Sequence, residues 1–404
     1  MAPARTRWDI VALAFAAGYM VGMQVGKVPP ALPLLQAELG LSRVIAGLIA
    51  SSFYGIGAVL GVTGGLLVDR LGIGRLVAVG GATMALASLA GGFASSGPPL
   101  LAARIVEGFG FATLSVAAPK MLFAATGDGV RRFVLGVWGT YMPVGIALSL
   151  VIATAMLEPL GWRGLWFLNA GLILLFLLAF AWAAAPGRWQ APAASGAAFD
   201  RAGVLETLAR PGPWLFGACF VIFAVQWQAL MAWLPTFLIE TQARSLSGAA
   251  LFTALFVLAT AFGSVASAWL MHRGGARWAL LGASFTGMGV CAALLFAPFT
   301  PIAAKIPLAV CFALAGGPVP AACFEGGIAH ASSQAQVAMA GGFVAQGAAL
   351  GAVLGPPLLA AVTEALGGWS AAWWTMFVCA GFGLAAVVGV WRADARIAGA
   401  EAAA

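Results

Sequence analysis

The stretch Gly65-Leu-Leu-Val-Asp-Arg-Leu-Gly-Ile-Gly-Arg75 places three charged residues where the apolar segment 44–68 gives way to the apolar segment 76–96. A helix needs about 20 residues to cross the roughly 30 Å hydrocarbon core of a bilayer, and each segment reaches that length. A short charged loop between two such segments is typical of a pair of membrane helices. The stretch therefore predicts two spanning helices that meet at one membrane surface.

The same alternation of apolar segments and short polar loops continues through the chain. Of its 404 residues, 62% are hydrophobic and 8% are charged, which is more apolar surface than one soluble core can bury. The runs are continuous, whereas a membrane β-barrel shows short stretches of alternating polarity. We predict an all-α membrane protein with twelve transmembrane helices, at 9–30, 44–68, 76–96, 99–124, 133–157, 164–185, 213–239, 248–271, 277–297, 304–328, 336–361 and 370–391.

Basic residues are concentrated in alternate loops. The chain carries 20 Lys and Arg residues and a formal charge of +7, and most of these residues fall on the side that includes both ends of the chain. Cytoplasmic loops of membrane proteins are enriched in Lys and Arg. We therefore expect a multi-pass protein of the bacterial inner (plasma) membrane with both termini in the cytoplasm and an uncleaved first helix, and we do not expect nucleic acid as a partner.

Residues 186–212 interrupt the pattern with Pro, Gly, Ser and charged residues. They predict a cytoplasmic linker between an N-terminal bundle of six helices, 1–185, and a C-terminal bundle, 213–404. The segment GWRGLWFLNA at 161–170 resembles GGWSAAWWTM at 367–376, and each comes before the last helix of its half. Such internal similarity is typical of transporters built from two related repeats.

Two motifs identify the family. The stretch 65–75 resembles the G-x-x-x-D-R-x-G-x-x-R loop of the major facilitator superfamily, and Arg104-Ile-Val-Glu107-Gly108-Phe-Gly110 resembles its R-x-x-x-G-x-G pattern. The resemblance implies two pseudo-symmetric bundles around a midplane site, which is reached by alternating access. It also implies that Gly65, Asp69, Arg70 and Arg75 form a gating loop on the cytoplasmic side. The corresponding loop of the second half, 269–277, has His272 where the family has an acid.

The subfamily resemblance is looser. Met142 interrupts the glycine and proline pattern typical of drug/proton antiporters, and 44–68 and 248–271 lack the arginines of nitrate carriers. Ala118-Pro119-Lys120 and the GWRGLW turn resemble the cyanate-permease branch. Lys27, near Pro29 and Pro30, is similar to the first-helix lysine that contacts the substrate carboxylate in monocarboxylate carriers.

Charged residues inside apolar segments are candidates for the site, because a cation at the bilayer centre costs about 2.5–3.5 kcal/mol. Lys27 is either a substrate ligand or an anchor that reaches the outer headgroups. Arg104 and Glu107 are three residues apart on one helix, so they form either a structural ion pair or an anion site coupled to a proton site. Glu325 has no cation nearby in the sequence and is a second candidate for proton coupling.

Polar and aromatic residues of other segments complete the predicted cavity. The resemblance makes the segments that contain Gln24, Arg104, Gln226 and Glu325 the cavity-facing ones. The predicted substrate-binding residues are Lys27, Arg104, Gln24, Tyr54, Tyr141, Trp138, Gln226 and Gln346.

These observations predict a transporter for a small organic anion, such as a monocarboxylate or a cyanate-like solute, with proton coupling. We expect no cofactor, no metal and no catalytic residues, since the two histidines lie in predicted loops and no nucleophile has a base in a suitable position. We expect a monomer in the bilayer. The alternatives are an exporter of drugs or metabolites and, from another class, a membrane sensor that no longer transports.

Overall fold

The computed structural model describes residues 6–60, 71–185, 206–207, 209–331 and 334–403, and in these residues it contains helices and no strand. Within these described residues, ten helices are long and apolar enough to cross a membrane, and Arg43–Val59 is a shorter apolar helix. One of the ten, α9 (Tyr141–Ala183), contains two of the predicted spans. The prediction of an all-α membrane protein with twelve spanning segments is confirmed.

The chain divides into two compact units. One comprises Met1–Phe199 and Leu234–Ala254, and the other comprises Asp200–Trp233 and Leu255–Ala404. The predicted linker 186–212 lies mainly outside the described residues, so its bounds and those of the two bundles stay predictions.

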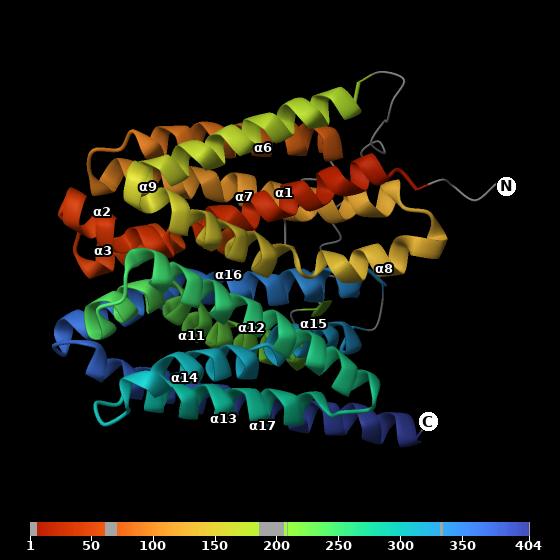
Figure 1. Cartoon of the computed structure of the whole chain (residues 1–404). Coiled ribbons are helices and arrows are strands. Elements are labelled where there is room, and N and C mark those ends of the chain that lie inside the picture. The colour runs from red at the N-terminus through yellow and green to blue at the C-terminus, as the bar shows by residue number, and fades with distance from the viewer. Residues whose placement is uncertain (1–5, 61–70, 186–205, 208, 332–333, 404) are drawn as a thin grey trace. The chain divides into compact units, whose positions relative to one another are not determined.

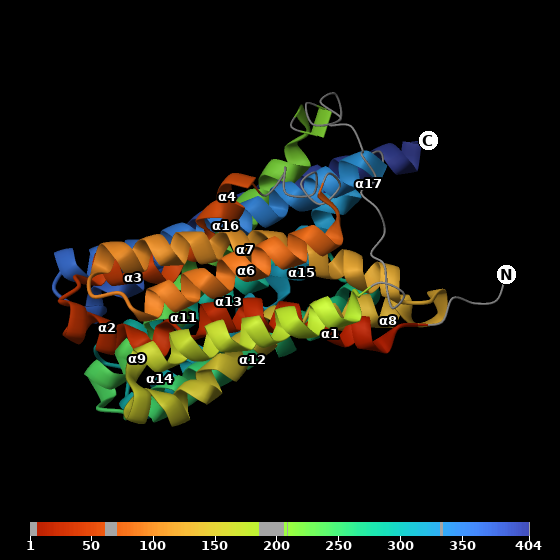
Figure 2. The same cartoon turned by 90° about the horizontal axis from the view of Figure 1, so that it is seen from above.

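The first unit begins with α1 (Trp8–Gly26), which packs against α7 (Gly97–Ala125) and α9, while α6 (Ile73–Gly92) packs between α7 and α9. Figures 1 and 2 show α6 beside α7. The second unit contains α11 (Pro211–Gln242) in part, α12 (Leu246–His272) in part, α13 (Arg277–Phe296), α14 (Ile302–Gly316), α15 (Pro318–Ala329), α16 (Gln334–Ala365) and α17 (Ala372–Ala403).

Glycine and proline break several of the predicted helices. The segment 9–30 ends as α1 and continues, after the Pro29–Ala31 turn, as α2 (Leu32–Leu39). The segment 44–68 divides into α3 (Arg43–Ser51), the short turn Ser52–Tyr54 and α4 (Gly55–Leu60).

Two further predicted helices are each divided by a break. The segment 133–157 is divided between α8 (Asp128–Trp138) and α9. The segment 304–328 is divided at Gly317 into α14 and α15, because the proline that follows, Pro318, lacks the amide hydrogen that a continuous helix needs.

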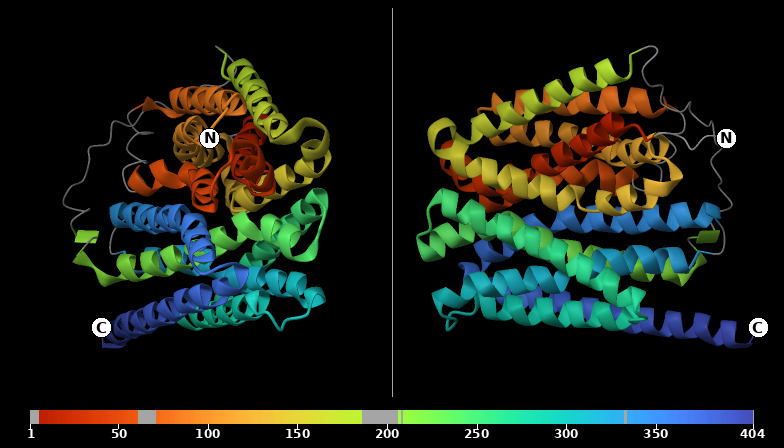
Figure 3. Two further views of the ribbon diagram at one scale, coloured as in Figure 1. Left: turned by 90° about the vertical axis from the view of Figure 1, so that its left-hand side faces the viewer. Right: turned by 45° about the vertical axis from the view of Figure 1, so that its right-hand side comes forward.

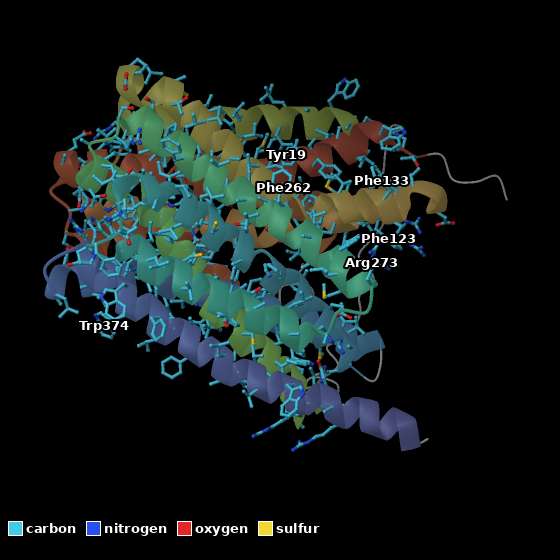
Figure 4. All side chains as sticks on the ribbon, turned by 60° about the horizontal axis from the view of Figure 1, so that its bottom comes forward. Tyr19, Phe123, Phe133, Phe262, Arg273 and Trp374 are labelled. Atoms are coloured by element: carbon cyan, nitrogen blue, oxygen red, sulfur yellow. The ribbon has the colours of Figure 1, made fainter. Side chains whose placement is uncertain are left out.

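The two predicted spans 133–157 and 164–185 meet at Gly161, where φ is +63°. This backbone conformation is accessible to glycine and costly for most other residues. The chain reverses direction at this turn, and the two arms of α9 diverge from it as a V, as Figures 1 and 3 show in yellow and yellow-green. Apolar side chains cover the outer faces of the helices; Phe262 on α12 and Trp374 on α17 are 71% and 42% exposed (Figure 4). Such surfaces are suited to contact with lipid.

Small residues bring α1 and α9 together. A β-carbon on Gly22 would lie 2.8 Å from the α-carbon of Gly145, and a β-carbon on Gly145 would collide with the backbone oxygen of Tyr19. Close helix contact through glycine is a common way to pack membrane helices. It holds the end of α1, with Lys27 at its C-cap, against the first arm of α9.

We expect Gly145→Leu to destabilise the protein by at least about 2–3 kcal/mol, because the two backbones would have to separate. Gly171→Ala in the same helix is a matched control, since Gly171 is exposed and has open space around it. The control should be neutral or slightly stabilising, because alanine favours a helix over glycine. Denaturation in mixed detergent micelles measures both changes. Equal stability of the two variants would show that the α1–α9 contact tolerates a side chain.

Candidate functional site

Three charged side chains lie completely buried in the first unit. Lys27 follows α1, and Arg104 and Glu107 lie on α7. The exposed fraction of each side chain is 0%. Buried charges are costly unless they are paired and hydrogen-bonded, so their contacts determine what this cluster can do. We call these three residues the charged cluster.

Lys27 has three kinds of partner. Its ammonium lies 2.8 Å from the Glu107 carboxylate and 2.9 Å from the Ser88 hydroxyl, to both of which it donates. Ser88 in turn donates to the backbone oxygen of Trp166 at 3.0 Å, and the Trp166 ring lies 4.5 Å from the ammonium. Ring and hydroxyl therefore hold the ammonium in place. Lys27 is therefore directed into the unit, where its side chain is fully buried.

Arg104 is held from three sides. Its Nη1 donates to Glu107 and, at 3.1 Å, to the backbone oxygen of Gln24, while its Nε donates to the backbone oxygen of Ile49 at 3.2 Å. The guanidinium lies 4.7 Å from the centre of the Phe53 ring. The predicted pairing of Arg104 with Glu107 is present, and Glu107 also bridges to Lys27, on a different helix.

Some polar atoms beside the cluster have no hydrogen-bond partner among the described residues. They are Nη2 of Arg104 and both side-chain atoms of Gln24, which are buried. A buried donor without a partner costs about 1–3 kcal/mol. The cluster also contains two cations and one carboxylate, so one positive charge is in excess. Unused donors beside excess positive charge are suited to binding an anion.

Glycine lets the surrounding helices approach the cluster. A β-carbon on Gly108 would collide with the backbone oxygen of Phe53, and one on Gly91 would lie 2.8 Å from the Trp166 ring. The small residues of α6 and α7 thus allow Phe53 and Trp166 to lie against Arg104 and Lys27. Gly108 lies one helical turn from Arg104. The close approach of Phe53 at Gly108 is therefore a local physical reason for the R-x-x-x-G spacing.

The predicted aromatic residues of the first unit form two groups. Trp138 stacks on Tyr141 at 4.3 Å between ring centres, and both lie against Gly18 of α1. Tyr54 packs edge-on against Phe53 and Phe111, at 5.6 and 5.5 Å. The second group is thereby joined to Arg104 through Phe53. Of the predicted residues, Gln24 and Tyr54 lie beside the charged cluster, to which Lys27 and Arg104 belong. Trp138 and Tyr141 instead lie beside Gly18 of α1.

The predicted residues of the second unit are dispersed. Gln226 is buried on α11, where its Nε2 donates to the backbone oxygen of Ile222 at 3.4 Å and its Oε1 has no partner among the described residues. Gln346 lies half-buried on α16. Glu325 is 53% exposed, and Arg277 lies 3.5 Å from it. No cation lies near Glu325 in the sequence, but the fold brings Arg277 to it from a helix that is remote in sequence.

The predicted gating loop lies mainly outside the described residues, which omit Gly65, Asp69 and Arg70. Arg75 is exposed near the start of α6. Among the described residues, no group of three or more His, Cys, Asp or Glu side chains could hold a metal ion.

Sequence reasoning missed Ser88, Trp166 and Phe53. Ser88 was detectable as a hydroxyl near the middle of the apolar segment 76–96, where it needs a partner. The two rings could not be distinguished from packing residues. The pairing of Lys27 with Glu107 was also missed, although two opposite charges in apolar helices commonly pair.

Comparisons with known proteins agree with this architecture. The sequence profile described as Major Facilitator Superfamily matches residues 10–324. The chain is 33% identical over 180 residues to the puromycin resistance protein pur8 of Streptomyces alboniger, in an alignment that covers 44% of this chain and 35% of that protein. It is 26% identical over 304 residues to the gallate transporter of Pseudomonas putida, with 66% of each covered.

The chain thus spans only 35% of the length of the resistance protein that it matches. Among solved structures, a bacterial homolog of the human lysosomal transporter Spinster, in an inward-facing and occupied conformation, superposes with a TM-score of 0.78. That alignment covers 96% of both chains at 16% identity, so the similarity is one of fold.

Proposed function

Because the chain belongs to the Major Facilitator Superfamily, we propose that it is a secondary transporter that carries a small organic anion across a bacterial inner membrane by alternating access. The family and the relatives indicate transport rather than catalysis of a chemical reaction. We further propose that both termini are cytoplasmic, that 1–185 and 213–404 form the two bundles joined by the linker 186–212, and that the protein acts as a monomer.

The charged cluster is the observation that carries the proposal. Its excess positive charge is buried, and a bound monoanion would neutralise it. The free Nη2 of Arg104 and the amide of Gln24 supply hydrogen-bond donors to a carboxylate. The rings of Phe53 and Tyr54 beside Arg104 offer an apolar surface for an organic substituent. A similar substrate class is named for one relative, the gallate transporter.

The position of Glu107 supports the proposal of proton coupling. This carboxylate neutralises Lys27 and Arg104 when no other anion is present. A substrate carboxylate that pairs with Arg104 would bring a second negative charge next to Glu107. Like charges favour protonation of a carboxylate, so Glu107 would take up a proton as the anion binds. Glu325 is a weaker candidate for this role, because it is half-exposed and pairs with Arg277.

The test is uptake of radiolabelled small carboxylates and cyanate into proteoliposomes, with and without an inward proton gradient. We expect uptake of one of these anions to be stimulated by the gradient and lost in Lys27→Ala and Arg104→Ala. Lys305→Ala is the matched control, since Lys305 lies half-buried on α14. No anion flux under any condition would overturn the proposal, and flux that ignores the gradient would overturn proton coupling alone.

A second candidate is export of drugs or metabolites, which the similarity to a puromycin resistance protein favours. Protection of growing cells against toxic compounds, in the absence of anion uptake, would support it. A membrane sensor would instead show saturable binding with no flux in vesicles.

A further inference from the structure

A second group of charged side chains lies in the other compact unit, remote in sequence from the charged cluster. It consists of Arg277 at the start of α13, Glu325 on α15, His330 directly after α15 and Asp394 on α17. Figure 1 shows α13 and α17 side by side. The His330 side chain is buried, with an exposure of 7%, and the Asp394 side chain is partly buried, with an exposure of 15%. His330 lies in the turn directly after α15, as a residue of a predicted loop should, but its ring is covered because it packs on Phe216 of α11.

The hydrogen bonds of His330 determine where its hydrogen lies. Nδ1 is 2.9 Å from the backbone oxygen of Gly326. A carbonyl oxygen only accepts, so Nδ1 carries the hydrogen. In a neutral imidazole the other nitrogen, Nε2, is then an acceptor. Nε2 has no hydrogen-bond partner among the described residues.

The atom that faces Nε2 is also an acceptor. Oδ1 of Asp394 lies 3.6 Å from Nε2, and it is buried without a partner among the described residues. An ionised carboxylate has no hydrogen to donate. Two buried acceptors that face each other repel, and both lose their contact with water. A single proton placed between them turns this repulsion into a charged hydrogen bond after a small approach of the two side chains.

The surrounding charges favour that proton. Oδ2 of Asp394 lies 3.6 Å from Nε of Arg277, and Arg277 lies 3.5 Å from Glu325. With His330 protonated, the group contains two cations and two carboxylates and is neutral. The other residues described against the imidazole, Phe216 and Gly212 of α11, are uncharged.

Solvent can reach the group. A pocket of about 410 Å³ is lined by Arg277, Trp278, Glu325, Trp391 and Asp394. Glu325 is half-exposed at this pocket, and Asp394 extends from it toward His330. Protons can therefore exchange with water through the carboxylate of Asp394, although the imidazole itself is covered.

We propose that His330 and Asp394 form a proton-binding site, which fastens the end of α15 to α17 when it is occupied. The site does not depend on the proposed substrate or on Glu107. When it loses its proton, Asp394 keeps Arg277 as its one partner among the described residues, and the contact between α15 and α17 weakens. The strength of the contact therefore depends on whether the proton is bound.

Nuclear magnetic resonance of the purified protein with isotope-labelled histidine tests the proposal directly. The chain has only two histidines, and exposed His272 is an internal reference. His272→Gln assigns the two signals. As pH is raised, we expect His330 to keep hydrogen on both ring nitrogens after His272 has lost one. In Asp394→Asn, His330 should lose its second hydrogen together with His272 or before it. Loss of the hydrogen at the same pH in wild type and Asp394→Asn would overturn the proposal.

A second measurement covers the case in which Asp394→Asn does not fold. Thermal unfolding of wild type, His330→Gln and His272→Gln is followed between pH 5.5 and 8.5. The protonated site adds stability at low pH that is lost as pH rises. The unfolding temperature of the wild type and of His272→Gln should therefore fall more steeply with pH than that of His330→Gln. Equal slopes in all three proteins would contradict the site.

Discussion

Replacing Glu107 by glutamine should destabilise the protein by about 3–5 kcal/mol, because Lys27 and Arg104 would then lie buried together without an anion. No other carboxylate contacts these two cations among the contacts described. Lys27→Met should cost much less, because it leaves Arg104 paired with Glu107 and removes the excess charge. Unfolding by SDS in mixed micelles, followed through the 15 tryptophans, measures both free energies.

The double variant Lys27→Met/Glu107→Gln separates charge from packing. It leaves one unpaired cation, Arg104, instead of two. We expect it to be more stable than Glu107→Gln alone, even though it removes one more native side chain. If Glu107→Gln and Lys27→Met cost the same and their effects add, the excess positive charge does not govern this cluster, and the basis for anion binding is lost.

Much of this architecture could be predicted from the sequence, because the bilayer imposes the length and composition of its helices. The segments 76–96, 99–124 and 277–297 correspond closely to α6, α7 and α13. Prediction was poorer where proline and glycine interrupt an apolar run. The breaks at Gly139 and Gly317 were not predicted, because hydropathy does not distinguish a broken helix from a straight one.

The charged cluster could be predicted in part. Lys27, Arg104 and Glu107 are conspicuous because charge is rare in apolar segments. Their arrangement was not evident, since spacing along one helix shows the Arg104–Glu107 pair but not the pair that joins Lys27 to Glu107 across two helices. The same limit applies to Glu325, whose partner Arg277 is 48 residues away in sequence.

Arg104→Lys should reduce uptake of the transported anion at least about tenfold, even though it keeps the positive charge. The guanidinium binds Glu107, Gln24 and Ile49 at once and still has Nη2 available. An ammonium is a single point charge with three donors and cannot reproduce this fork. Lysine at this position would satisfy the protein partners or the anion, but not both.

The concentration dependence of uptake distinguishes binding from a structural role. If Arg104 contacts the anion, the concentration that gives half-maximal uptake should rise in Arg104→Lys while the amount of folded protein stays the same. Arg163→Lys is the matched control, because Arg163 pairs with Glu38 and with the backbone oxygen of Ala94, away from the charged cluster. The control should keep uptake within about twofold. A lower maximal rate with an unchanged half-saturating concentration would assign Arg104 to the structure of the first unit, and the anion would then have to bind elsewhere.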